Sequence, residues 1–313
     1  MAEGEAVFKL DPAPGTDGAC PSIISVSRRT DIPSFYAEWF VKRVAEGYAD
    51  VRHPFTPALV KRVSLRAEDI RAFVFWTRDF TPLRDIFHSE LERRHLYMVL
   101  WTLTGYPPIL EPMAPPVQSV LDSFRETARS SRRGLLVWRY DPIVVNDVFD
   151  ARWHVDNFSR LASALEGSTD RVIISVMTPY RSVMKRFRER NVEYDESLYE
   201  RGGERLSFLS RLREIAGEHG MKMQACCHGG ALLPYGIADG ACIDAAYMAE
   251  RLGLEAGPER DPGQRKACLC AKSIDIGAYD CCPRNCLYCY ATKSPEKSKL
   301  HWKSFDQSGE SLR

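Results

Sequence analysis

Three cysteines near the end of the sequence have a type and spacing suited to binding iron. Cys282, Cys286 and Cys289 form a C-x3-C-x2-C pattern, with Tyr288 directly before the third cysteine. A [4Fe-4S] cluster takes four ligands, so three thiolates leave one iron open to a second, chelating molecule. The pattern therefore predicts a cluster that binds a small molecule directly, with the protein providing orientation and the cofactor providing reactivity.

A structural zinc site is the alternative interpretation of this region. Cys268, Cys270 and Cys281 lie close by in the sequence, and Zn²⁺ accepts four thiolates. Zinc sites usually pair two C-x2-C-like knuckles, so the spacing here favours iron and sulfur. Disulfides would need an oxidising compartment. Because the N-terminus has neither a basic region nor an apolar stretch of signal-peptide type, we expect a cytoplasmic protein with reduced cysteines.

Composition limits the classes of partner. The 313 residues are 44% hydrophobic and 27% charged, enough for a large core, and the formal net charge is only +1. This balance argues against a general nucleic-acid or membrane binder, and no apolar run approaches the roughly 20 residues of a membrane span. The basic run at 185–188 is interpreted as a solvated helix face.

Short apolar runs alternate along the chain with stretches of helical period. The predicted strands are 23–26, 72–76, 96–103, 135–138, 172–176 and 221–225, with a shorter one at 49–51. The predicted helices are 34–46, 82–94, 116–130, 151–165, 203–219 and 241–252. Such alternation is typical of parallel strands joined by helices, and continuous hydrophobicity indicates strands covered on both faces.

These elements predict an α/β fold, a complete or partial TIM-like β/α barrel. No G-x-G-x-x-G turn follows the first strand, which argues against a dinucleotide-binding sheet. We expect a flexible leader at 1–21, the barrel at 22–255, a Cys-rich cluster segment at 256–292 that folds over the barrel mouth, and a tail at 293–313.

Polar residues follow the predicted strands. Arg29 and Asp31 come after the first strand, and Arg139 and Asp141 come after the fourth. Barrel enzymes build their active sites at the carboxyl ends of the strands, so these side chains are candidates for binding a ligand. The alternative is that Asp31 and Asp141 form caps and turns. Arginine, with its fork of donors, is the expected partner of a carboxylate.

The cysteine loop resembles that of the radical S-adenosylmethionine (SAM) superfamily. Together with motifs at 27–33, 75–77, 103–106, 138–142, 268–270 and 273–277, it makes residues 22 to 292 similar to a bacterial family known as a domain of unknown function. Members of this family look like atypical radical SAM proteins with the cluster loop at the C-terminus. The resemblance implies SAM as the chelating molecule, and we expect a reductase or flavodoxin-type electron donor. From their positions after the strands and in the cysteine loop, Arg29, Arg139, Asp141 and Tyr288 are the candidates for binding SAM.

The same resemblance extends to an enzyme class of arsinothricin biosynthesis, and it implies transfer of a 3-amino-3-carboxypropyl group from SAM to arsenite. Trivalent arsenic is soft, so thiols beside the cluster could hold it, and Cys226, Cys227 and Cys281 are the candidates. Cys226 could equally be a buried small hydrophobe. A further alternative groups four cysteines as a second metal or cluster site: Cys226, Cys242, Cys268 and Cys270.

Two other functions stay open from the sequence. A radical SAM enzyme could instead form a 5′-deoxyadenosyl radical and act on an organic or nucleic-acid substrate. A zinc-stapled barrel could bind a ligand without any redox chemistry. The sequence does not decide which carbon-sulfur bond of SAM would break, because the orientation of the sulfonium decides it.

Overall fold

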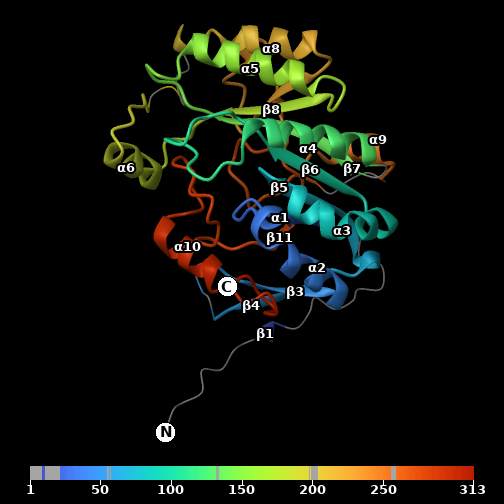
Figure 1. Cartoon of the computed structure of the whole chain (residues 1–313). Helices are drawn as coiled ribbons and strands as arrows, with labels where there is room; N and C mark the ends of the chain where they lie inside the picture. The colour runs from blue at the N-terminus through green and yellow to red at the C-terminus, as the bar shows by residue number, and fades with distance from the viewer. Residues whose placement is uncertain are drawn as a thin grey trace.

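Eight parallel strands form the main sheet of the protein (Figure 1). The computed structural model describes residues 9–10, 22–54, 56, 58–131, 134–196, 198, 204–254 and 259–313, so most of the predicted leader lies outside the described residues. The strand order is β10-β9-β8-β7-β6-β5-β2-β11, and the edge strands β10 and β11 do not pair with each other. The predicted α/β fold is confirmed as a partial, TIM-like half-barrel.

Each of the six main predicted strands is present in this sheet. They are β2 (Ser22–Val26), β5 (Ile70–Thr77), β6 (Tyr97–Thr102), β7 (Gly134–Ile143), β8 (Arg171–Val176) and β9 (Lys222–Cys226). The edge strands β10 (Asp239–Gly240) and β11 (Ile274–Asp275) have two residues each and were not predicted. Segments this short and polar form no apolar run that a sequence pattern could reveal.

Alternate residues of the strands enter two separate cores. Ile24 and Phe73 belong to the core beneath the helices, whereas Ile23 and Val74 belong to the core on the opposite face. The second core also contains Met248 of helix α9 and several cysteines of the C-terminal half. Both faces are therefore buried, which explains the continuous hydrophobicity of the strands.

The helices largely follow the predicted ranges. They are α1 (Ile32–Phe35), α2 (Ala37–Glu46), α3 (Thr81–Arg94), α4 (Val117–Ser130), α5 (Ala151–Leu165), α6 (Arg181–Glu189), α8 (Leu209–Glu218), α9 (Ala245–Leu252) and α10 (Pro295–Lys303), with 3₁₀ turns η1 (Ala67–Asp69), η2 (Glu204–Leu206) and η3 (Leu233–Tyr235). Asp150 caps α5 by accepting from the amide of Trp153, and Asp244 starts α9 in the same way. The helix expected at 34–46 is interrupted at Tyr36, whose backbone is not helical.

A small second sheet has the order β1-β4-β3. Its strands are β1 (Lys9–Leu10), β3 (Tyr48–Arg52) and β4 (Val60–Ser64), and β3 and β4 are antiparallel. The short run at 49–51 was expected among the parallel strands, but it belongs to this hairpin. The error arose because an isolated apolar run shows that a strand exists, not which strand it pairs with.

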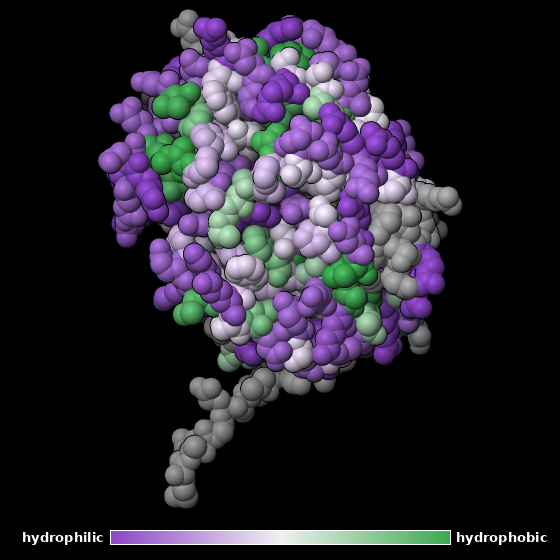
Figure 2. Space-filling view, viewed as in Figure 1, coloured by the Kyte–Doolittle hydropathy of each residue, from purple (hydrophilic) through white to green (hydrophobic). Residues whose placement is uncertain are grey.

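The C-terminal segment returns to the beginning of the chain. In Figure 1 the red helix α10 lies beside the blue N-terminal elements, and Trp302 packs edge-on against Phe35 with ring centroids 5.5 Å apart. Trp39 donates its indole N–H to the carbonyl of Gly309 at 2.9 Å. The face seen in Figure 2 is mostly hydrophilic, with small scattered hydrophobic patches. Among the described residues, no helix has the length and apolarity needed to cross a membrane.

Candidate active site

A cavity of about 800 Å³ lies at the carboxyl ends of the sheet strands. Residues at or near the ends of five strands line it: Ser27, Thr77, Thr102, Asp141 and Cys226. Asp141 was predicted to follow the fourth strand but lies within β7, which extends to Ile143. Its volume is within the range of small-molecule sites, and parallel sheets place their ligands at this edge. The cavity is therefore the candidate active site.

All three cysteines of the motif line this cavity. Cys282 is buried, Cys286 and Cys289 are partly buried, and a turn joins the last two through a 3.0 Å bond from the Cys289 amide to the Cys286 carbonyl. Burial raises the pKa of the Cys286 thiol to about 11, and it raises that of Cys282 as well. These thiols are protonated at neutral pH until a metal displaces the protons.

The donor set of this loop fits an iron-sulfur cluster with one open iron. Three thiols face one cavity that extends well beyond them, which leaves space for a chelating molecule. Among the described residues, no three His, Cys, Asp or Glu side chains already surround a common point as metal ligands do. The loop thus has ligands of the right type in the right place, and its side chains would turn inward on binding.

A buried ion pair anchors the motif at Tyr288. Arg78 and Glu111 lie 2.9 Å apart and both are buried. The Tyr288 hydroxyl accepts from Arg78 and donates to Glu111, and Thr104 also donates to Glu111. Tyr288 was predicted to bind a cofactor, and it does line the cavity, but its hydroxyl is already used to hold the loop against the sheet.

A second ion pair anchors the motif at Arg284. Its guanidinium donates to Asp31 at 3.1 Å and to Ser34 at 2.6 Å, and it also donates to the Met113 carbonyl at 2.7 Å. Asp31 accepts from Thr77 at 2.6 Å and caps helix α1 by accepting from the Ser34 amide. Asp31 therefore acts both as the predicted cap and as an anchor of the cysteine loop.

Arg186 of helix α6 holds the other end of the motif. Its guanidinium donates to the carbonyls of Leu287 at 3.0 Å, Thr292 at 2.9 Å and Cys289. The basic run around it was predicted to be solvated, and Lys185 is indeed 74% exposed. For Arg186 that prediction is wrong, because a charge run does not show which one of its members turns inward.

Two arginines bracket an aromatic ring in the cavity. The guanidinium carbon of Arg28 lies 5.2 Å from the Trp76 ring centroid, and that of Arg139 lies 4.9 Å from it. Arg139 also pairs with Asp141, which accepts from Ser175 as well. The Nη2 of Arg28 and the Nε of Arg139 are buried without a hydrogen-bond partner. Buried donors of this kind favour an anionic ligand nearby.

Arg29 lies at the cavity but is used mainly by the protein itself. It donates to the Gly277 carbonyl at 3.3 Å, its guanidinium lies 5.1 Å from the Tyr279 ring centroid, and Asp275 is 3.9 Å away. Arg139 is also used by the protein, through Asp141, but it differs from Arg29 in having a buried Nε without a hydrogen-bond partner.

Asp275 joins the last strand of the sheet to the first. Its carboxylate accepts from Ser25 at 2.9 Å, from Ser27 at 2.6 Å and from the Arg28 amide at 2.8 Å. The adjacent Gly277 approaches so closely that a Cβ there would lie 1.9 Å from the Ser27 hydroxyl oxygen. Sequence reasoning did not single out Asp275, Arg78, Glu111 or Arg186, since an isolated charged residue gives no spacing signal.

Of the three thiols predicted to hold an acceptor, only that of Cys226 lines the cavity. Cys281 is 1% exposed, and its sulfur contacts the carbonyls of Tyr279 and Leu312 instead. Cys227 is also buried and contacts Cys268. His228 accepts from the Val176 amide at 3.0 Å, and burial lowers its pKa to about 4.

A second set of thiols does come together. Cys242 donates to Cys226 with the two sulfurs 3.3 Å apart, and Cys270 is in hydrogen-bonding contact with Cys242 and with Cys268. These are the four residues that the sequence offered as an alternative metal site. All four line the cavity.

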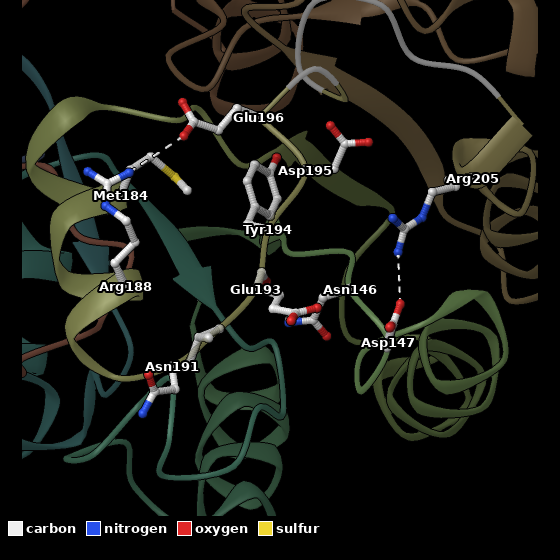
Figure 3. Close-up of a pocket in the computed structure, with 11 residues that line it drawn as sticks. Asn146, Asp147, Met184, Arg188, Asn191, Glu193, Tyr194, Asp195, Glu196 and Arg205 are labelled. Atoms are coloured by element: carbon white, nitrogen blue, oxygen red, sulfur yellow. Dashed lines mark hydrogen bonds and ion pairs between the residues drawn. The ribbon is translucent and has the colours of Figure 1, made fainter.

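Another hollow, of about 650 Å³, lies beside helix α6 (Figure 3). Arg188 pairs with Glu196 at 3.8 Å, and Arg205 pairs with Asp147 at 3.4 Å. Tyr194, between these pairs, donates its hydroxyl to the Met177 carbonyl. No thiol lines this hollow and its two arginines have acidic partners, so it offers less chemistry than the cavity at the strand ends.

Comparison with known proteins gives a family and no activity. No curated protein matches the chain, and no solved structure does. One family model matches residues 23–291, a range that includes β3 to β11, all of β2 except Ser22, and the complete cysteine motif. The chain therefore belongs to the family described as "Domain of unknown function (DUF1848)".

Proposed function

We propose that this protein is a radical SAM enzyme that holds a [4Fe-4S] cluster through Cys282, Cys286 and Cys289. The observation that carries the proposal is that all three thiols face the cavity at the strand ends, beside buried arginine donors that lack partners. When bound, the cluster supplies the electron that breaks a carbon-sulfur bond of SAM.

The residues of the cavity would bind and orient SAM. Arg139 has a buried Nε without a hydrogen-bond partner, and a carboxylate of the ligand could accept from it. The Trp76 ring packs against both guanidinium groups and so holds Arg28 and Arg139 beside the cavity. The anchors at Arg78, Arg186 and Arg284 keep the loop fixed, so that the reacting atoms stay in one geometry.

The finer part of the proposal is transfer of the 3-amino-3-carboxypropyl group to arsenite. It rests on the family resemblance and on a cavity with space for SAM and a small acceptor. One electron breaks the sulfonium bond and releases methylthioadenosine and the carbon radical. Formation of the carbon-arsenic bond then takes a second electron and one proton as an arsenic hydroxyl leaves as water. A reductase or flavodoxin-type protein would supply both electrons.

The alternative reaction forms a 5′-deoxyadenosyl radical and removes hydrogen from an organic substrate. Product analysis separates the two reactions, because reductive cleavage yields methylthioadenosine in the first and 5′-deoxyadenosine with methionine in the second. Arsenite should increase methylthioadenosine formation in the first case and yield an arsenic species that carries the transferred group.

The experiment that tests the cluster is anaerobic reconstitution followed by iron, sulfide and absorbance measurements. Alanine at Cys282, Cys286 or Cys289 should abolish the oxygen-sensitive cluster. Cys281→Ala is the matched control: this thiol directly precedes the motif but lies outside the cavity, so the variant should assemble the cluster. Wild-type protein that takes up no iron and sulfide would refute the proposal.

A further inference from the structure

Four cysteines from three separate segments meet on one wall of the cavity. Cys226 ends strand β9, Cys242 follows β10, and Cys268 and Cys270 belong to the segment that leads to β11. Their thiols form a row of contacts, Cys226 with Cys242, Cys242 with Cys270, and Cys270 with Cys268. Cys227 also contacts Cys268 but does not line the cavity. We call this group the thiol chain. The proposed function uses none of its members.

Positively charged and N–H donor groups lie beside part of the thiol chain. The guanidinium of Arg28 lies close to Cys270 and Cys242, and that of Arg139 lies close to Cys242. Each arginine has a buried nitrogen without a hydrogen-bond partner. The Ile243 amide also points at the Cys270 sulfur at 3.4 Å. Donors from backbone and arginine around thiolates are the usual outer partners of a metal site.

The spacing of the sulfurs favours a single metal ion over a cluster. Tetrahedral zinc, with Zn–S bonds of about 2.3 Å, places its sulfurs roughly 3.8 Å apart. Cys226 and Cys242 are already 3.3 Å apart, so these two need separate only slightly. Among the described residues no three ligands yet surround one point, so binding would require the two ends of the row, Cys226 and Cys268, to move toward each other. Several iron atoms would force the thiols much farther apart.

We propose that Cys226, Cys242, Cys268 and Cys270 bind one Zn²⁺ as a tetrathiolate site. The ion would staple the open side of the half-barrel, because Cys242 follows the edge strand β10 and Cys270 precedes the opposite edge strand β11. A 2.9 Å bond from the Ala271 amide to the Ile243 carbonyl already joins these two segments. The site is separate from the motif cysteines and holds whether or not the proposed function does.

The test uses Co²⁺, whose thiolate complexes absorb strongly where a metal-free protein does not. The full chain with Cys282, Cys286 and Cys289 all replaced by alanine removes the other cysteine loop. After chelation and anaerobic titration, this variant should bind one Co²⁺ per chain with sulfur-to-metal charge transfer, and one equivalent of Zn²⁺ should displace it. Adding Cys242→Ser or Cys270→Ser should weaken Co²⁺ binding at least tenfold and reduce the charge-transfer intensity.

Cys281→Ser in the same background is the control, since it removes a buried thiol outside the thiol chain. It should keep the full cobalt spectrum. The proposal is overturned if the background variant gives no thiolate charge transfer, or if the Cys242 and Cys270 variants match the control. Uptake of iron and sulfide in place of zinc would also overturn it, as would binding of arsenite without binding of Zn²⁺ or Co²⁺. Circular dichroism of each metal-free variant separates lost ligands from lost folding.

Discussion

The contact between Arg186 and the cysteine motif leads to a prediction that does not depend on any cofactor. Arg186→Met keeps most of the side-chain length but removes the donors to the carbonyls of Leu287, Cys289 and Thr292. Hydrogen bonds from a charged group contribute about 1.5–3 kcal/mol each when buried. Arg186 is only half-buried, and water can replace part of these bonds, so we expect a loss of about 2–4 kcal/mol in total.

The loss should appear as local opening of the loop, not as global unfolding. Hydrogen exchange reports this opening at the Leu287 amide, which is bonded to the Leu110 carbonyl at 2.8 Å, and at the Cys289 amide. A cost of that size corresponds to exchange faster by about 30- to 700-fold. Arg186→Lys should recover little, because one ammonium cannot reach three carbonyls.

Arg188→Met is the matched control, since Arg188 lies on the same helix and its side chain is 67% exposed. It should leave exchange at both amides unchanged. Equal exchange rates at these amides in the Arg186 and Arg188 variants would show that Arg186 does not hold the cysteine loop.

Further predictions concern pH, the ligand and the sheet. Burial lowers the pKa of His154 to about 4, so between about pH 6.5 and 4 only the unfolded chain takes up this proton. The free energy of unfolding should therefore fall by up to about 3 kcal/mol as the pH is lowered over that range. Urea unfolding of His154→Gln should show a shallower pH dependence than that of the wild type. Arg139→Ala should weaken SAM binding about ten- to a hundredfold by calorimetry, with poor rescue by lysine; wild-type affinity would show that another group holds the carboxylate. Gly277→Ala should lower the free energy of unfolding, measured by thermal melts, by about 1–3 kcal/mol, because its Cβ would meet Ser27. Gly217→Ala, with open space around its Cβ, should be neutral or stabilising in the same assay.

The parallel sheet could be predicted from the sequence because its strands are buried on both faces. Runs such as 172–176 are apolar without interruption, and the helices between them show a clear period. The edges of the sheet could not be predicted in this way. β10 and β11 are held by pairing with β9 and β2, and their own residues carry no hydrophobic pattern. Whether the barrel closes depends on these edges, so the sequence left that question open.

The candidate site, like the sheet, could be predicted only in part from the sequence. The spacing of Cys282, Cys286 and Cys289 predicted a ligand loop, and the position of Arg139 after a strand predicted the cavity. The residues that hold the loop were missed, since Glu111 and Arg186 are brought to it only by the tertiary fold. Proximity in sequence also did not show which thiols meet. The Cys281 sulfur contacts the Leu312 carbonyl although Cys281 is next to Cys282, whereas Cys226 contacts Cys242, as in the alternative grouping of four cysteines.

The pairing of β11 with β2 has a consequence for the order in which the protein folds. Ile274 pairs with Ile24, so the strand that leads into the cysteine motif joins the sheet across 250 residues of chain. Contacts at such separation form slowly, because the entropy of closing the intervening loop must be overcome first. The units from β5 to β9 pair with sequence neighbours and can form earlier. We therefore expect refolding intermediates with a nearly complete sheet and unprotected cysteines. In such intermediates the thiols can oxidise or take up the wrong metal before the cavity exists.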